Sequence, residues 1–340
     1  MSPGNTGSAP PPADLNELRS ELREAAEPER VPELQRLFKT GPGGYGEGDV
    51  FLGVRVPAVR VVARRHAGLN LDGVTKLLRS PVHEERLAAL VILVRRYGRG
   101  DEQQRQRIYN LYLGSMAHVN GWDLVDVSAP HIVGAHLLDR KGAERQVLDR
   151  LASSPSVWER RIAIMATYAF VRAGDCDETL RLARVLLDDE HDLIHKAVGW
   201  MLREVGKRDE ELLVGFLEHH AGDMPRTMLR YAVERLDASL RAELMAAGLR
   251  RTATVGASDP GQNNRRSPPS ANLIRPAASC PALYFDLPPP QRPYRRRCRV
   301  DLETLLVHLY FLVDEWWPKD PSSRAEEARP LAVAVAERGP

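Results

Sequence analysis

Apolar residues recur with the spacing of an amphipathic helix from about Asp14 to Gly248. The interruptions are short and rich in residues that end helices and form turns; they fall at 41–48, 68, 80–81, 98–100, 120–121, 153–155, 174 and 222–225. No alternating pattern convincingly indicates a strand. Residues 50–56 could be extended, before Pro57 opens the next helix. The pattern predicts an all-α fold.

The predicted helices resemble one another at a regular interval. The segment at 85–90 (Glu-Arg-Leu-Ala-Ala-Leu) is echoed at 159–164 (Glu-Arg-Arg-Ile-Ala-Ile), and related segments begin at 122, 195 and 230. Successive steps are 37, 37, 36 and 35 residues. A period of this length is typical of stacked helix pairs of the HEAT or armadillo kind. The sequence therefore predicts a HEAT-like helical solenoid.

Three of these repeats carry a tryptophan and a charged residue three or four positions apart. Such a spacing places both side chains on one face of a helix. The pairs are Trp122 with Asp126, Trp158 with Arg161, and Trp200 with Lys196. Because equivalent helices of a solenoid line one concave wall, an acid, bases and tryptophans should meet there. We expect a functional site on that wall.

Both ends of the chain differ in composition from the helical part. Residues 1–13 form a leader of glycine, serine and proline, and residues 251–340 hold 13 of the chain's 25 prolines. Such segments bury too little apolar surface to fold. We expect a disordered leader at 1–13, a repeat domain at 14–250, and a largely disordered tail at 251–340 with one helix near 301–317.

The overall composition indicates a cellular setting. With 340 residues, 43% of them hydrophobic, the chain can bury a large core. Its three cysteines form no CxxC pair and leave one unpaired, which suits a reducing cytoplasm. No signal peptide opens the chain, and the longest apolar run, 305–313, is too short to span a bilayer. We expect a cytoplasmic monomer that does not contact membranes.

Charge is nearly balanced in the helical part of the chain. Residues 1–250 contain 35 Lys and Arg against 36 Asp and Glu. Nucleic-acid binding would therefore require positive charge gathered on one face. The candidates are Arg55, Arg60, Arg64, Arg65, Arg160, Arg161, Lys196, Arg203 and Lys207. Charge alone leaves this interpretation and that of solvated helix surfaces equally open.

Two further motifs fit the chemistry they suggest poorly. Residues 41–46 match G-x-G-x-x-G, but dinucleotide binding requires a preceding strand, whereas here a helix precedes and Pro42 interrupts. His191 and His195 have the spacing of a zinc-protease helix, but Asp192 replaces the general-base glutamate and no third ligand follows. We therefore expect a turn-rich loop at 41–48, and neither a metal nor another cofactor.

Three segments of the repeat region resemble one known family. They are residues 120–126 (Asn-Gly-Trp-Asp-Leu-Val-Asp), 158–163 (Trp-Glu-Arg-Arg-Ile-Ala) and 192–204 (Asp-Leu-Ile-His-Lys-Ala-Val-Gly-Trp-Met-Leu-Arg-Glu). Together with residues 39–57, which are similar to an N-terminal signature of many members, they resemble the AlkD-like DNA alkylation repair proteins. These are DNA glycosylases built from HEAT-like repeats. The resemblance covers roughly residues 14–248 in consistent order.

The resemblance implies hydrolysis of the N-glycosidic bond of cationic N3- and N7-alkylated purines, such as 3-methyladenine and 7-methylguanine, in double-stranded DNA. It implies that Asp126 is the catalytic carboxylate, which stabilises the developing sugar cation and positions water. It also implies that Trp122 and Trp200 are cleft tryptophans and that Arg161 pins a backbone phosphate. Lys196, from the charge pattern, joins them as a candidate for DNA binding.

The same residues also allow a structural interpretation. Trp122 and Trp200 can be packing residues, Asp126 can cap a turn, and Arg161 can pair with Asp126. Trp158, to which the family motif gives no catalytic role, is expected in the core. The alternative function is a non-catalytic HEAT-like module that binds DNA or a protein, and such a module has no need of Asp126. The sequence leaves open the lesion range, base flipping, and the roles of loop 41–48 and the tail.

Overall fold

The computed structural model describes residues 14–255; the leader, the tail from residue 256, and the helix expected near 301–317 lie outside the described residues. The described part consists of α-helices and short helical turns without a β-strand, which confirms the all-α prediction. The segment around Val50 is extended, and an isolated parallel bridge joins Val50 to Val82. α3 then begins at Val56, with Pro57 in its first turn.

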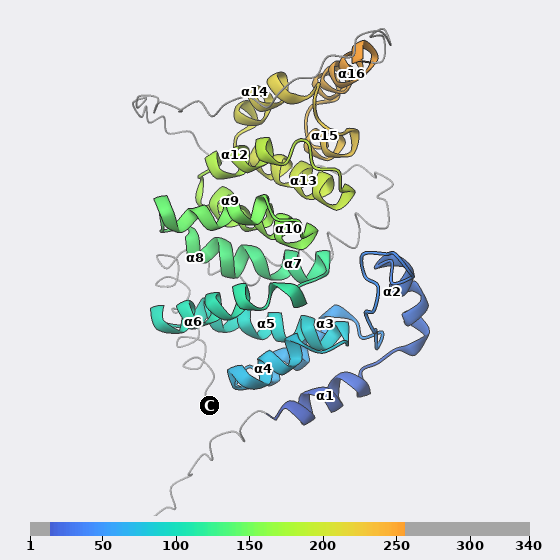
Figure 1. The fold of residues 1–340 in the computed structure, drawn as a ribbon, viewed down its shortest axis with the longest axis vertical. Helices are drawn as coiled ribbons and strands as arrows, with labels where there is room; N and C mark the ends of the chain where they lie inside the picture. Colours follow the sequence, from blue (N-terminus) through green and yellow to red (C-terminus); the bar gives the residue numbers. More distant parts are fainter. Residues whose placement is uncertain (1–13, 256–340) are drawn as a thin grey trace, which may run out of the picture.

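Most helices follow one another with short connections, whereas residues 38–55 form a long connection between α2 and α3 (Figure 1). They are α1 Leu15–Glu24, α2 Val31–Leu37, α3 Val56–Arg65, α4 Leu71–Leu78, α5 His83–Arg99, α6 Glu102–Gly114, α7 Trp122–Ala129, α8 Ala135–Leu137, α9 Gln146–Ala152, α10 Val157–Ala166, α11 Tyr168–Ala173, α12 Asp177–Val185, α13 Asp192–Arg208, α14 Glu210–His220, α15 Arg226–Ala232 and α16 Ala238–Val255. A π-turn, Pro130–Gly134, joins α7 to α8.

The helices stack into a two-layer solenoid. α5, α7, α10, α13 and α15 contact one another in that order and contain the segments whose period the sequence shows. α6, α9, α12 and α14 form the second layer, beside the first in Figure 1. α2 does not continue the stack (Figure 1), and Phe38, which follows it, packs on Trp122 at the start of α7. The solenoid prediction is confirmed.

Local chemistry explains where many helices begin and end. Several first turns are capped by a side-chain oxygen that accepts a backbone N–H, which satisfies a donor that the helix itself cannot. These caps are Asp14, Asn70, Asp101 and Asp209. α11 ends at Gly174, whose φ of 89° is the left-handed conformation that glycine adopts without strain.

Two glycines allow neighbouring helices of the first layer to approach closely. A Cβ added at Gly134 would lie 2.1 Å from the Ala166 carbonyl oxygen, and one at Gly199 would lie 2.4 Å from that of Met228. Since backbone cannot move aside as a flexible side chain can, these positions fix the spacing of α10 from the π-turn and of α13 from α15. That spacing sets how near the cleft side chains of successive repeats come.

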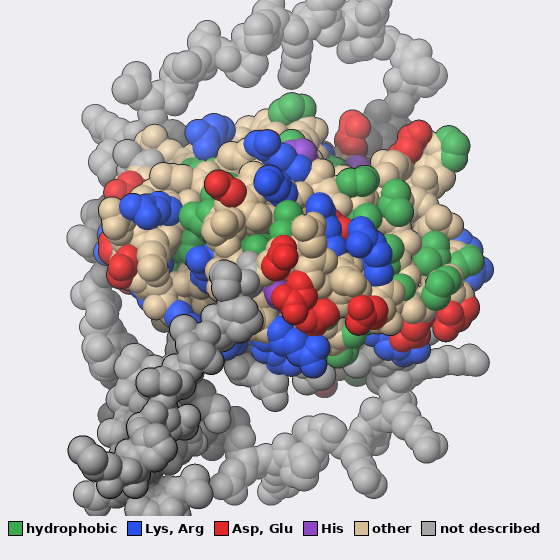
Figure 2. All heavy atoms as spheres, turned by 90° about the horizontal axis from the view of Figure 1, so that it is seen from below, with side chains coloured by type: hydrophobic (Ala, Val, Ile, Leu, Met, Phe, Trp, Pro, Cys, Tyr) green, Lys and Arg blue, Asp and Glu red, His purple; other side chains and the backbone are tan. Residues whose placement is uncertain are grey.

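The surface carries mixed charge. Seen from the end of the stack that carries α1, basic and acidic side chains lie next to one another (Figure 2). Within residues 14–255, no helix is both long enough and apolar enough to cross a lipid bilayer.

We predict that Gly199→Ala destabilises the protein by about 1–3 kcal/mol, because the new methyl group would overlap backbone. The matched control is Gly215→Ala in α14, where nothing lies within 4 Å of an added Cβ. There the better helix propensity of alanine should stabilise by about 0.5–1 kcal/mol. Urea unfolding measures both variants. Equal effects at the two positions would contradict the close-approach argument.

Candidate functional site

The five residues predicted for the site lie around one cleft. Trp122 and Asp126 come from the first two turns of α7, Arg161 comes from α10, and Lys196 and Trp200 come from α13. The cleft is completed by Leu37, Lys39, Tyr45, His191, Asp192, Leu193, Arg203 and Tyr231. The repeat period therefore brings together predicted site residues that are as much as 78 positions apart in sequence, from Trp122 to Trp200.

Asp126 and Arg161 form a buried ion pair with two hydrogen bonds. Arg161 donates from Nε to Asp126 Oδ1 at 2.8 Å and from Nη2 to Oδ2 at 2.7 Å. Arg161 Nη1 donates to the Leu193 carbonyl at 2.7 Å, which ties α10 to the start of α13. Burial raises the pKa of Asp126, and the adjacent guanidinium opposes that rise. The carboxylate is thus held in a fixed orientation with little water around it.

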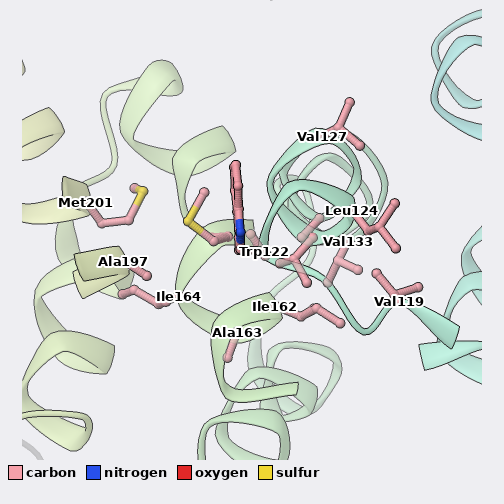
Figure 3. Close-up of a cluster of buried hydrophobic side chains, with 14 of the residues drawn as sticks. Val119, Trp122, Leu124, Val127, Val133, Ile162, Ala163, Ile164, Ala197 and Met201 are labelled. Atoms are coloured by element: carbon pink, nitrogen blue, oxygen red, sulfur yellow. The ribbon is translucent and has the colours of Figure 1, made fainter. Parts of the chain in front are cut away.

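Trp122 and Trp200 each have one ring face covered by another aromatic side chain. Trp122 stacks on Phe38 with ring centres 5.1 Å apart and planes 6° from parallel. Trp200 stacks on Tyr168 at 5.9 Å, and its Nε1 donates to Glu204 at 2.9 Å. Both tryptophans are less than 9% exposed. Figure 3 shows Trp122 standing among aliphatic side chains of the α7, α10 and α13 repeats. Each ring is therefore fixed before any ligand arrives.

Lys196 and Trp158 take different positions. Lys196 lies at the cleft, 3.1 Å from the carboxylate of Asp192 one turn earlier, and its side chain is 29% exposed. Trp158 belongs to the hydrophobic core, as the sequence predicts, and its ring meets Tyr45 edge-on at 5.8 Å. Lys196 is therefore the more accessible of the two to a ligand.

Lys39 and Tyr45 line the cleft and were not predicted as site residues. Both belong to the loop between α2 and α3, whose role the sequence left open. The Lys39 ammonium lies 5.6 Å from the centre of the Tyr45 ring, a cation–π distance. The sequence could have indicated them only as a lysine and an aromatic residue in or beside a glycine-rich loop. The tertiary structure places them at the same cleft as α7 and α13.

The two motifs judged weak in sequence have structural roles. The glycine-rich segment forms turns between two helices, not a strand-to-helix turn. His191 Nδ1 accepts the Leu193 N–H at the start of α13, and the His195 ring contacts the Asp189 carbonyl. In residues 14–255 there is no group of three or more His, Cys, Asp or Glu side chains placed to hold a metal ion.

Comparison with known proteins bears on this cleft. The family model for "DNA alkylation repair enzyme" matches residues 18–236, more than half of the chain and all of the cleft. The chain belongs to this DNA alkylation repair family. A solved structure of a predicted DNA alkylation repair enzyme from Enterococcus faecalis shares its fold, with a TM-score of 0.50 and 14% identity over 63% of this chain and 97% of that one. No curated protein matches.

For this DNA alkylation repair protein we predict that Arg161→Ala lowers the free energy of unfolding by about 3–5 kcal/mol, because it leaves the buried Asp126 carboxylate without its counter-charge. Arg55→Ala is the matched control, since Arg55 makes two hydrogen bonds of the same kind to Glu27 at the surface, with its side chain 62% exposed. Denaturant unfolding measures both variants. A loss no greater than that of the control would mean that the buried pair contributes little.

The phosphate contact expected of Arg161 stays a prediction. In Arg161→Ala, loss of such a contact should weaken DNA binding and should reduce the steepness of log K against log salt by about 0.9. An unchanged slope would mean that Arg161 contacts no phosphate.

Proposed function

We propose that this protein is a DNA glycosylase that hydrolyses the N-glycosidic bond of cationic N3- and N7-alkylated purines in double-stranded DNA. The observation that carries the proposal is a buried carboxylate, Asp126, that two hydrogen bonds from Arg161 hold at a cleft also lined by two fixed tryptophans. Membership of the DNA alkylation repair family supports it. The proposed chemistry needs no metal or other cofactor.

The reaction accounts for the residue types. Alkylation at N3 or N7 gives the purine a formal positive charge, so the base leaves as a neutral molecule when the C1′–N bond breaks. The bonding electrons pass to the base, and positive charge develops on the deoxyribose. Asp126 stabilises that charge and orients the water whose oxygen bonds to C1′ and whose released proton passes to solvent. A carboxylate serves the same purpose beside the sugar cation in glycoside hydrolysis.

The remaining cleft residues bind the substrate in this proposal. Trp122 and Trp200 present their uncovered parts to the cationic base, and each contact contributes about 0.5–2 kcal/mol in a desolvated cleft. Lys196 and the remaining N–H groups of Arg161 contact backbone phosphates and set the position of the duplex. We expect a single copy of the protein to act on one duplex, in the cytoplasm.

A second function, DNA binding without catalysis, is favoured by one observation. Arg161 neutralises Asp126, and both side chains are buried, the arrangement that a purely structural pair would have. The two functions differ in what they require of the Asp126 charge, and a substitution that removes only this charge distinguishes them.

Asp126→Asn should slow base release by roughly 10²–10³-fold, because a neutral amide cannot stabilise the sugar cation. DNA binding should change much less. The assay is single-turnover release of 7-methylguanine by purified protein, with circular dichroism to establish folding. Asp192→Asn is the control, since its carboxylate pairs with Lys196 at the cleft and its side chain is 57% exposed. Release at the wild-type rate by folded Asp126→Asn would leave DNA binding as the function.

The enzyme should release cationic lesions and leave neutral ones. Departure of uracil, hypoxanthine or 8-oxoguanine is assisted by protonation of the base, which requires an acid. Among the described cleft residues, His191 is a poor one, because burial lowers its pKa and leaves the imidazole neutral. A duplex series that differs only in the lesion, assayed at saturating enzyme, measures this selectivity. Efficient excision of uracil would contradict the proposed chemistry.

A further inference from the structure

The segment from Phe38 to Val54, here called the strap, runs across the edges of three helices of the stack. Phe38 stacks on Trp122 of α7, and Tyr45 meets Trp158 of α10. Asp49 binds the His83 side chain at the start of α5. The strap therefore reaches the cleft at one end and is anchored at α5 at the other.

The strap has a defined conformation between these contacts. A Cβ added at Gly44 would lie 1.8 Å from the Lys39 carbonyl oxygen, and one at Gly46 would lie 2.3 Å from that of Phe38. The Tyr45 hydroxyl donates to the Leu37 carbonyl at 2.8 Å. These contacts fold the strap tightly on itself, so that a displacement at its anchor is transmitted to its aromatic residues.

The anchor is a buried histidine between two carboxylates. His83 Nδ1 lies 2.9 Å from Asp49 of the strap, and Nε2 lies 2.7 Å from Asp123 of α7. Asp49 also accepts from Arg86 at 2.6 Å. All four of these side chains are buried. Only a doubly protonated imidazole donates from both nitrogens, so a positively charged His83 satisfies both carboxylates at once.

Backbone bonds extend the anchor. The Glu84 carboxylate accepts from the N–H groups of Leu52, Gly53 and Val54 at 2.8–3.2 Å. The His83 N–H donates to the Val50 carbonyl at 2.8 Å. The end of the strap is thus fixed to the first turn of α5 by two consecutive residues, His83 and Glu84.

Aromatic rings connect the anchor to the cleft. The His83 ring stacks on Phe51 at 4.6 Å and lies 4.8 Å from Phe38. Phe38 in turn covers one face of Trp122. An imidazolium attracts aromatic rings more strongly than a neutral imidazole does, because the ring faces are electron-rich.

We infer that His83 is a positioning residue: charged between Asp49 and Asp123, it fixes the strap on α5 and α7 and so holds Phe38 on Trp122 and Tyr45 at the cleft. Its effect on catalysis rests on the proposed function, whereas its effect on the strap does not. The strap is then a wall of the cleft whose position depends on one proton.

The charged groups around His83 come from three segments: Asp49 on the strap, Glu84 and Arg86 on α5, and Asp123 on α7. Burial alone disfavours the imidazolium, but the Asp123 carboxylate and the bond to Asp49 outweigh burial and raise the pKa of His83 to about 9, while Arg86 opposes this rise. In the unfolded chain the pKa is 6.5. The stabilisation is therefore complete below pH 6.5, declines as pH rises, and is absent above about 9.

The first experiment follows the strap in the free protein. The indole N–H resonance of Trp122, assigned by its loss in Trp122→Phe, should shift with a midpoint near pH 9, the pKa of His83. Amide exchange of residues 49–54, corrected for intrinsic rates, should accelerate between pH 7 and 10. In a second arm, His83→Gln should accelerate amide exchange of residues 49–54 at pH 7 by on the order of 10²-fold. This factor is the change in the opening equilibrium that corresponds to the shift in the pKa of His83. The variant should also lose the pH-dependent step.

His136→Gln is the matched control. His136 is another buried histidine, stacked on Tyr109 at 3.8 Å and bonded to the Tyr97 hydroxyl at 3.1 Å, away from the strap. Burial lowers its pKa to about 4, so it carries no charge at neutral pH. The control should lose stability without affecting either strap signal. Strap signals that respond equally in both variants, or that stay flat through pH 9 in the wild type, would overturn the inference.

Base release is the final measurement. His83→Gln should lower the rate from alkylated DNA below pH 9 and should remove the alkaline limb of the wild-type pH profile near 9. Failure of the wild type to release any base would sink the proposed function alone, because the strap signals need no substrate. A pH-dependent strap with no effect on an active enzyme would overturn the positioning role.

Discussion

The two hydrogen bonds between Arg161 and Asp126 join two repeats at the cleft. A carboxylate buried among α7, α10 and α13 would take up a proton without a counter-charge, because desolvation disfavours its ionised form. The guanidinium opposes this and also binds the Leu193 carbonyl, so one side chain fixes the spacing of three successive repeats. Charge at Asp126 and the geometry of the stack are therefore maintained by the same contacts. In the proposed glycosylase, Arg161 opposes the rise in the pKa of Asp126 that burial causes, while the acid stays nearly free of water.

The tryptophans show how the cleft is made rigid before a ligand binds. Phe38 covers one face of Trp122 and Tyr168 one face of Trp200, so neither indole can rotate freely. Both tryptophans already lose their side-chain conformational entropy on folding, so they lose less of it when a ligand binds. In the proposed glycosylase, a cationic base meets two fixed electron-rich surfaces and a fixed carboxylate, an arrangement that selects for charge more than for the edge of a particular base.

Buried charge recurs at the edge of the stack, where His83 lies between Asp49 and Asp123. Like the pair in the cleft, it joins a loop and helices that are distant in sequence, and it costs desolvation that only the paired charges offset. The solenoid supplies apolar packing along its length, whereas the positions of the strap and of the cleft side chains depend on these ion pairs.

Periodicity in the sequence determined the helices, their repeat and the solenoid, because apolar spacing and capping residues act over a few positions. It also put Trp122 and Asp126 on one helix face, since four residues make about one turn. The sequence offered the pairing of Arg161 with Asp126 only as an alternative, and it did not indicate that Phe38 covers Trp122 or that Lys39 and Tyr45 enter the cleft. Those contacts join residues 35 or more positions apart, and they depend on how closely helices pack at glycines such as Gly199 and on where an irregular loop crosses the stack. Only the tertiary structure decides them, because no local rule relates one repeat to the next.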